Sequence, residues 1–216
     1  MRVFTFAAIA LILGQSSWHF VQVPGADGGS VTTYGAPPKA LSCLPNWYAG
    51  TVTLKPDKGW GLMLDGGVFL DWDTGLQIVD PEVEESSDLK DIFRTRFRPG
   101  PIIALDSRDA GPIDDPGRIR VEQLFSQTYG ATPDEVEAHI AKVRFFGTRY
   151  AFHEKAAPAL ERVVGRLEIA QKRNPSIRVF LRKIVGTWAW RKIDRSNNLS
   201  AHAWAIAIDL NTERSN

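Results

Sequence analysis

The stretch from Leu199 to Asn211, which reads LSAHAWAIAIDLN, decides how the C-terminal part of the chain is expected to fold. Its residues 203–208 are uncharged and lie between His202 and Asp209. An apolar run of this length with polar ends is typical of a buried strand. His202 and Asp209 are an odd number of positions apart, so a regular strand would place them on opposite faces. If both serve one site, the backbone must bend between them, and we expect that bend just after His202.

A neutral imidazole and a carboxylate that converge at a strand end suit a divalent transition metal. Zinc takes nitrogen and oxygen ligands in a tetrahedron, and a catalytic zinc keeps one position for water. The same spacing is also expected of polar residues that only cap and solvate the ends of a strand. The spacing therefore leaves both interpretations open.

The sequence of residues 199–211 resembles the S-x-H-x-x-G-x-A-x-D signature of zinc peptidases that cut bacterial cell-wall peptides. These enzymes form the D-alanyl-D-alanine carboxypeptidase and L-alanyl-D-glutamate peptidase family. The matching positions are Ser200, His202, Ala207 and Asp209. Residues 186–193, GTWAWRKI, are also similar to the family segment before the signature, which carries a Trp-Arg pair. The resemblance is specific over residues 186–211 and fainter back to about residue 43.

The resemblance implies a role for each matching residue. His202 and Asp209 would hold Zn²⁺, which lowers the pKa of a bound water to roughly 7 and polarises a scissile carbonyl. Arg191 would stabilise an oxyanion or grip a substrate carbonyl, although an Arg on a strand surface is an equally good interpretation. Ser200 would cap the turn that aims His202. The implied substrate is the peptidoglycan stem peptide, cut as a carboxypeptidase or as an L-Ala-D-Glu endopeptidase.

The sequence departs from the family pattern in two places. The usual Gly is Ala205, which puts a Cβ where the bend could need a positive φ. The family's third zinc ligand is a downstream His in a Met-His-Phe-like segment with an acidic general base nearby, and neither precedes the last residue, Asn216. Since a catalytic zinc usually has three protein ligands, we expect this chain to be truncated before its third ligand and to hydrolyse slowly or not at all. The alternative is a catalytically inactive exported domain that binds the cell wall or another partner.

Composition and charge narrow the possible functions. The 216 residues are enough for one domain with a sizeable core, or for a domain with a small appendage. The 26 Lys and Arg residues are interleaved with 25 Asp and Glu residues, so nothing indicates nucleic-acid binding. The single cysteine, Cys43, excludes an intramolecular disulfide. No pattern predicts an oligomeric state.

The N-terminal residues are expected to direct export. Residues 1–17 combine Arg2, an apolar run over residues 3–13, and small residues at Gly14 and Ser16, which together predict a signal peptide. This run is too short for a stable membrane anchor, and the protein is expected in the periplasm or outside the cell. The alternative is a buried N-terminal helix or strand. Residues 18–42 are rich in Gly, Pro, Ser and Thr and are expected to be a linker.

Residues 43–120 are expected to form a β-rich and loop region. Three β-prone pieces, residues 48–54, 61–64 and 68–72, are separated by turn signals and predict a small antiparallel meander. Aspartates in its turns lack the spacing and closing Glu of an EF-hand, so we expect them to be solvated rather than to bind calcium.

Residues 121–216 are expected to form the incomplete peptidase domain. Thr132, Pro133 and Glu135 predict a capping box at the start of a helix. An apolar stripe would continue that helix, and a second amphipathic helix would end near residues 174–175. The apolar positions of the two helices are Val136, Ile140 and Val143, then Leu160, Val163, Val164 and Leu167.

Three closing strands are expected over residues 177–181, 186–193 and 204–211. Helices thus precede strands without strict alternation, which favours an α+β fold. We expect helices packed against a small antiparallel sheet, with an N-terminal β-rich extension. His139 and His153 fall in or near the helices, where surface histidines are more common than metal ligands.

Overall fold

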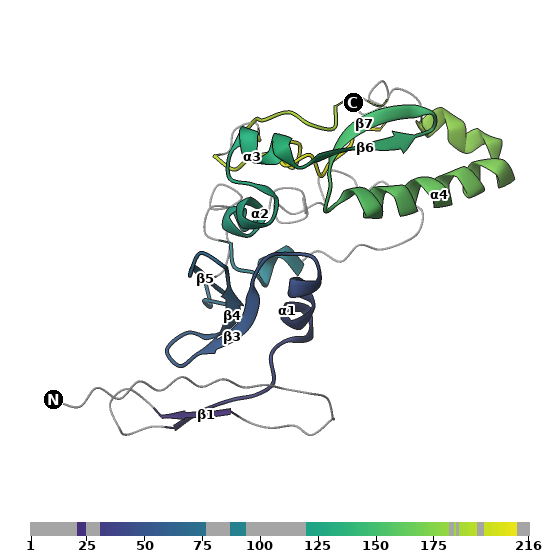
Figure 1. Cartoon of the computed structure of the whole chain (residues 1–216). Helices are drawn as coiled ribbons and strands as arrows, with labels where there is room; N and C mark the ends of the chain where they lie inside the picture. Colours follow the sequence, from purple (N-terminus) through teal and green to yellow (C-terminus); the bar gives the residue numbers. More distant parts are fainter. Residues whose placement is uncertain are drawn as a thin grey trace, which may run out of the picture. The chain divides into compact units, whose positions relative to one another are not determined.

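The computed structural model describes residues 21–24, 31–76, 87–93, 120–181, 184, 186–193 and 197–210. The predicted signal peptide, residues 1–17, lies outside these residues. The chain divides into two compact units, Met1–Pro37 and Pro38–Asn216 (Figure 1). Helices and small antiparallel sheets make up the described parts, and the expected α+β class is confirmed. In those parts, no helix has both the length and the apolar character needed to cross a membrane.

The first unit contains a two-stranded antiparallel ladder. β1 (Val21–Pro24) pairs with β2 (Val31–Tyr34), with Val21 opposite Tyr34. Both strands fall within residues 18–42, which were expected to be a linker. Val and polar residues alternate over the first three positions of β1, and β2 consists of the β-prone residues Val, Thr and Tyr, which favours extended pairing.

The second unit begins with the predicted β-meander. α1 (Lys39–Cys43) and the 3₁₀ helix η1 (Leu44–Asn46) lead into β3 (Thr51–Lys55), β4 (Gly59–Met63) and β5 (Phe69–Asp71). The strands pair antiparallel in the order β3-β4-β5, which confirms the meander. A short 3₁₀ helix, η3 (Asp91–Phe93), and α2 (Glu122–Tyr129) follow.

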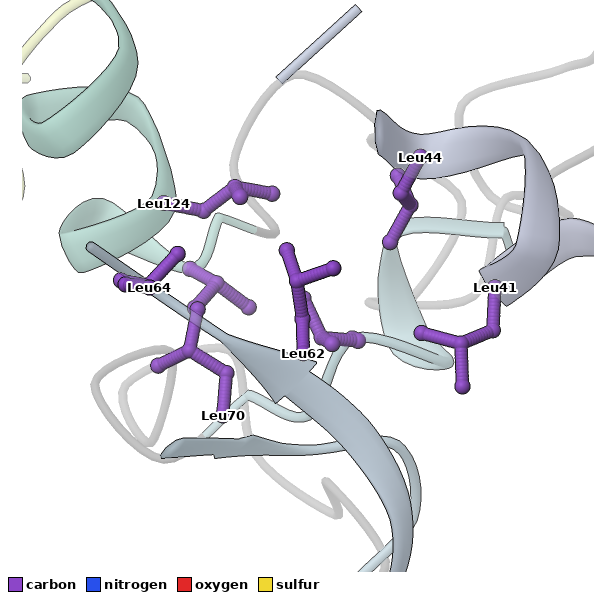
Figure 2. Packing of buried hydrophobic residues seen from close by; sticks show 8 residues of the cluster. Leu41, Leu44, Leu62, Leu64, Leu70 and Leu124 are labelled. Carbon is purple, nitrogen blue, oxygen red and sulfur yellow. The ribbon is translucent and has the colours of Figure 1, made fainter. Parts of the chain in front are cut away.

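A leucine cluster forms the core of this part. Figure 2 shows side chains from α1, the meander and α2 pointing toward one another. Burying a leucine side chain contributes about 1.5–3 kcal/mol, so this cluster holds the meander against α2. The labelled leucines are Leu41, Leu44, Leu62, Leu64, Leu70 and Leu124, all buried.

The rest of the second unit is a β-hairpin with helices before and after it. The hairpin packs on α4, the helix that follows it in the chain (Figure 1). Its buried side chains include Val143, Phe145 and Phe152 of the hairpin with Leu160 and Val164 of the helix. The elements are α3 (Pro133–Ala138), β6 (Ile140–Phe145), β7 (Thr148–His153), α4 (Ala157–Arg173) and the 3₁₀ helix η4 (Pro175–Leu181).

The predicted helix ends differ in accuracy. Thr132 Oγ1 accepts the Glu135 N–H at 3.3 Å, and a Glu135 carboxylate oxygen accepts the Ala131 N–H at 2.7 Å, so the predicted cap forms. The apolar stripe was wrong beyond Val136, because α3 ends at Ala138. Residues 142–145 alternate charged and apolar side chains, and this period of two produces β6 instead.

The three closing strands were also wrong. Residues 177–181 belong to η4, and Lys192 of the second segment forms an isolated antiparallel bridge with Leu199, which precedes the third segment. Residues 201–205 form a turn, which interrupts the strand expected from the apolar run. Ala203, Trp204 and Ala205 are buried all the same, because the turn itself packs into the core, whereas residues 206–208 are partly exposed.

Candidate functional site

The first part of the signature, with Ser200 and His202, lies on an irregular hairpin made by residues 186–193 and 197–206. The Ser200 N–H donates to the Arg191 carbonyl at 2.9 Å, and the Ala189 N–H donates to the His202 carbonyl at 3.1 Å. The Ile193 N–H donates to the Asn198 carbonyl at 2.9 Å. These bonds join the segment with the Trp-Arg pair to the segment with the signature, as neighbours in space.

The bend expected after His202 is present. The Ala203 N–H donates to the Ser200 carbonyl at 2.8 Å, and the Ala205 N–H donates to the His202 carbonyl at 3.1 Å. Ala205 has a φ of 53°, in the left-handed region that disfavours a Cβ. This is the position at which the signature carries Gly, so the geometry of the turn explains that preference physically.

Trp204 fixes the turn in the core. Its side chain is fully buried, its indole N–H donates to the Gly130 carbonyl at 3.1 Å, and its ring stacks on Phe125 with centroids 5.2 Å apart. The next residue, Ala205, accepts the His153 N–H at 2.8 Å through its carbonyl. The turn is therefore held by a bulky apolar group and by hydrogen bonds to two other elements.

His202 and Asp209 meet beyond the bend. His202 Nε2 lies 3.3 Å from Asp209 Oδ1, and the side chains are 10% and 50% exposed. The imidazole is thus nearly buried, whereas the carboxylate reaches solvent. The Ser200 hydroxyl accepts the His202 N–H at a long 3.4 Å, so it contacts the backbone of the turn that carries His202.

The pair has the separation that a zinc ion needs. Two ligands at the usual zinc distances, arranged tetrahedrally, are separated by roughly 3.3–3.5 Å. The observed 3.3 Å between Nε2 and Oδ1 matches that spacing, and it is equally the spacing of a direct ion pair. A nitrogen and an oxygen donor also fit the chemistry of zinc. These two residues can therefore supply part of a zinc site.

No third donor joins this pair within the described ranges. There, no group of three or more His, Cys, Asp or Glu side chains has the arrangement of a metal site. His139 Nδ1 instead contacts Glu154 Oε1 at 2.8 Å, on a surface where both side chains are about half exposed. His153, expected as a surface residue in or near a helix, is instead buried at the end of β7.

His153 is held as a neutral imidazole. Its Nε2 lies 3.0 Å from the Tyr129 carbonyl, which can only accept, and its Nδ1 lies 3.2 Å from the Lys155 N–H, which can only donate. These partners assign the proton to Nε2 and occupy the lone pair of Nδ1. Burial lowers the pKa of His153 below its usual value, in agreement with this arrangement.

Arg191 lies beside the signature through its backbone. Its side chain is exposed and makes no hydrogen bond or ion pair with another described residue. The structure therefore brings its carbonyl, rather than its guanidinium, into contact with the signature. Its expected role at a substrate carbonyl stays a prediction.

Two residues that position the signature were not predicted from the sequence. Glu122 Oε2 accepts the Leu199 N–H at 2.9 Å, and Arg120 Nη1 donates to the Leu199 carbonyl at 2.7 Å. Both charged groups hold the residue that directly precedes Ser200. An open hollow of about 460 Å³ lies next to them and is bounded by Arg120, Glu122 and Asn198, among others. No local pattern could reveal contacts between residues 77 and 79 positions apart.

Comparison with known proteins adds no relative. A scan against protein-family models, a search of curated proteins and a search of solved structures each returned no match.

Proposed function

We propose that this chain is a zinc-dependent peptidase-like protein that acts on cell-wall peptides. The observation that carries the proposal is the approach of His202 Nε2 to Asp209 Oδ1 at 3.3 Å, despite their mismatched strand parity. In the signature that the sequence resembles, these two positions hold zinc. The positive φ of Ala205 supports the same interpretation, because it falls where the signature has Gly.

The residues of the turn have complementary roles in this proposal. His202 and Asp209 hold the metal, which when bound supplies an acidified water and polarises the scissile carbonyl. Trp204 and Ser200 set the position of the His202 backbone, and this limits the freedom of the imidazole. Arg191 would reach the substrate from the neighbouring segment, using its fork of donors on a carbonyl oxygen. The hollow beside Leu199 offers space of the size that small ligands occupy.

A second function is favoured by the number of donors. The described residues supply two ligands, whereas a catalytic zinc usually has three from the protein. An inactive exported domain that binds cell-wall peptide would keep the turn and the hollow without needing a complete metal site. The two functions differ in turnover and share the substrate.

Hydrolysis and binding of a stem peptide separate the two functions. The full chain, loaded with zinc, is incubated with a synthetic L-Ala-D-Glu-L-Lys-D-Ala-D-Ala peptide, and the products are separated by mass. Zinc-dependent cleavage that His202→Ala abolishes supports the peptidase. Binding without cleavage supports the inactive domain. If the peptide is neither cut nor bound, and His202→Ala changes nothing, both functions are excluded.

The matched control for this experiment is His139→Ala. His139 also pairs with a carboxylate, at 2.8 Å from Glu154, but neither residue belongs to the signature. Loss of cleavage or binding in His202→Ala alone assigns the effect to the signature. An equal loss in both variants would instead indicate a general effect of removing a His–carboxylate pair.

A further inference from the structure

The outer face of the β6–β7 hairpin carries three cations and no acid. Arg144 and Arg149 are direct cross-strand partners, so their side chains project from the same face. Lys142 precedes Arg144 by two positions and shares that face. All three are exposed, and none makes a side-chain hydrogen bond or ion pair with another described residue. We call these three residues the basic face.

The opposite face of the hairpin is the one that packs on α4. Val143, Phe145 and Phe152 belong to the buried cluster with Leu160 and Val164. The hairpin is therefore supported by α4 on one face, and its register sets the backbone positions of the three cations on the other face. Its two-residue loop reinforces this, because Phe146 and Gly147 both have positive φ, as a tight type I′ turn requires.

The arrangement of the cations opposes folding unless an anion is present. Like charges directly opposite each other on a ladder are destabilising, and Arg144 faces Arg149 with no acid to separate them. Residues 140–181 contain nine Lys or Arg and three Asp or Glu, whereas the whole chain has 26 against 25. The positive charge is thus concentrated in the hairpin and the helix behind it.

The basic face is continuous with the candidate site. His153 and Ile140 are cross-strand partners on the same side of the hairpin as Lys142, at the opposite end from the Arg pair. The His153 N–H donates to the carbonyl of Ala205, in the turn that carries His202. A ligand that lies along the basic face would therefore run toward the signature.

We propose that the basic face binds the carboxylates of polymeric peptidoglycan and so holds the polymer beside the His202 turn. The face offers repeated charges rather than one enclosed pocket, which suits a polymer with a carboxylate on each stem peptide. Two neighbouring guanidinium groups match a carboxylate better than two ammonium groups, because each presents a planar fork of donors. The identity of the polymer rests on the proposed function, whereas the binding is measurable without zinc or hydrolysis.

The test is co-sedimentation of the full chain with purified peptidoglycan sacculi in the presence of a chelator. The triple variant Lys142→Gln, Arg144→Gln, Arg149→Gln is expected to raise the apparent Kd roughly tenfold, because each exposed ion pair contributes modestly. Conversion of the carboxyl groups of the sacculi to amides should raise the apparent Kd of the wild-type protein by a similar factor. Added salt should weaken binding by the wild-type protein more than by the variant.

A matched control removes three positive charges from the exposed side of α4 instead of from the hairpin. Arg162, Arg166 and Arg173 are exposed on α4, away from its buried Leu160 and Val164 side. The triple Gln variant at these positions should bind sacculi within about threefold of wild type, since net charge alone contributes little at moderate salt. Equal losses in the two triple variants would overturn the proposal.

Three further outcomes decide the assignment. Tighter binding to single-stranded DNA or to phosphatidylglycerol vesicles than to sacculi, lost in the basic-face variant, would assign this face to another polyanion and overturn the proposal. Retained binding in His202→Ala, with peptide cleavage lost, is the expected separation of the two proposals. Failure of zinc binding with sacculus binding intact would remove the proposed function and leave the basic face as a polymer-binding surface.

Discussion

His202 Nε2 lies 3.3 Å from Asp209 Oδ1, although the two residues are an odd number of positions apart and would face away from each other on a regular strand. The turn at residues 201–205 makes this possible, and Ala205 adopts the left-handed conformation within it. The contact therefore depends on one backbone dihedral and on the side chains that hold the turn in the core. The predictions for Ala205 and Trp204 follow from that dependence.

Ala205→Gly should be far better tolerated than Ala203→Gly. Both alanines are fully buried in the same turn, but only Ala205 has a positive φ. Glycine at position 203 should lower the free energy of unfolding by about 1–2 kcal/mol, through chain entropy and lost burial. At position 205 the release of about 1–2 kcal/mol of left-handed strain should offset that loss. Urea unfolding of both variants measures the difference, and equal destabilisation would contradict the assigned conformation.

Trp204→Ala should unfold the turn and destabilise the whole second unit. Truncating a buried Trp costs about 3–5 kcal/mol, and here it also leaves the Gly130 carbonyl without its indole donor. Trp47 is 65% exposed, and its replacement by Ala should change stability by no more than about 0.5 kcal/mol. Thermal unfolding followed by circular dichroism compares them. Similar melting temperatures for the two variants would show that the turn does not depend on Trp204.

Stability should fall as the pH drops below the usual pKa of histidine, because of His153. Burial lowers its pKa in the folded chain, so the unfolded chain binds more protons over this window. The contribution is fully present above about pH 6.5 and is lost as the pH falls toward the lower folded pKa. His153→Gln should remove this part of the pH dependence, whereas His139→Gln should keep it. Parallel stability curves for wild type and His153→Gln would refute the neutral assignment.

Arg149→Glu should stabilise the hairpin. The substitution turns a like-charged cross-strand pair into an opposite-charged one, which should raise the free energy of unfolding by about 0.5–1 kcal/mol. Lys142→Glu makes the same change in net charge opposite Ala151, where no cross-strand charge exists, and should have a smaller effect. Chemical denaturation at low salt measures both. A larger gain in Lys142→Glu would contradict the observed register.

The sequence indicated the fold where short-range patterns are strong. The meander followed from three β-prone pieces and the turns between them, and the cap at Thr132 followed from a local motif. The helical stripe failed because Val136, Ile140 and Val143 match a helical period by coincidence, while residues 142–145 alternate. In that case the strand period determined the structure.

The site was predictable in part. The approach of His202 to Asp209 was expected from the signature, and it required a bend between them. The structure contains the bend and the contact between the two side chains. The strand expected over residues 204–211 was wrong. The apolar run indicated that Trp204 is buried, but it did not indicate that the backbone carries Trp204 into the core on a turn rather than on a strand. The hydrogen bonds of Glu122 and Arg120 to the Leu199 backbone join distant parts of the sequence, so no local spacing predicts them.

Zinc titration of the purified full chain tests the central claim most directly. Isothermal titration should give one zinc per wild-type chain, and His202→Ala and Asp209→Asn should each weaken binding by at least about tenfold, as expected when a donor is lost. His139→Ala should bind zinc like wild type, because its partner is Glu154. Wild-type protein that binds no zinc, or equal affinity in His202→Ala and wild type, would show that the His202–Asp209 contact is only an ion pair.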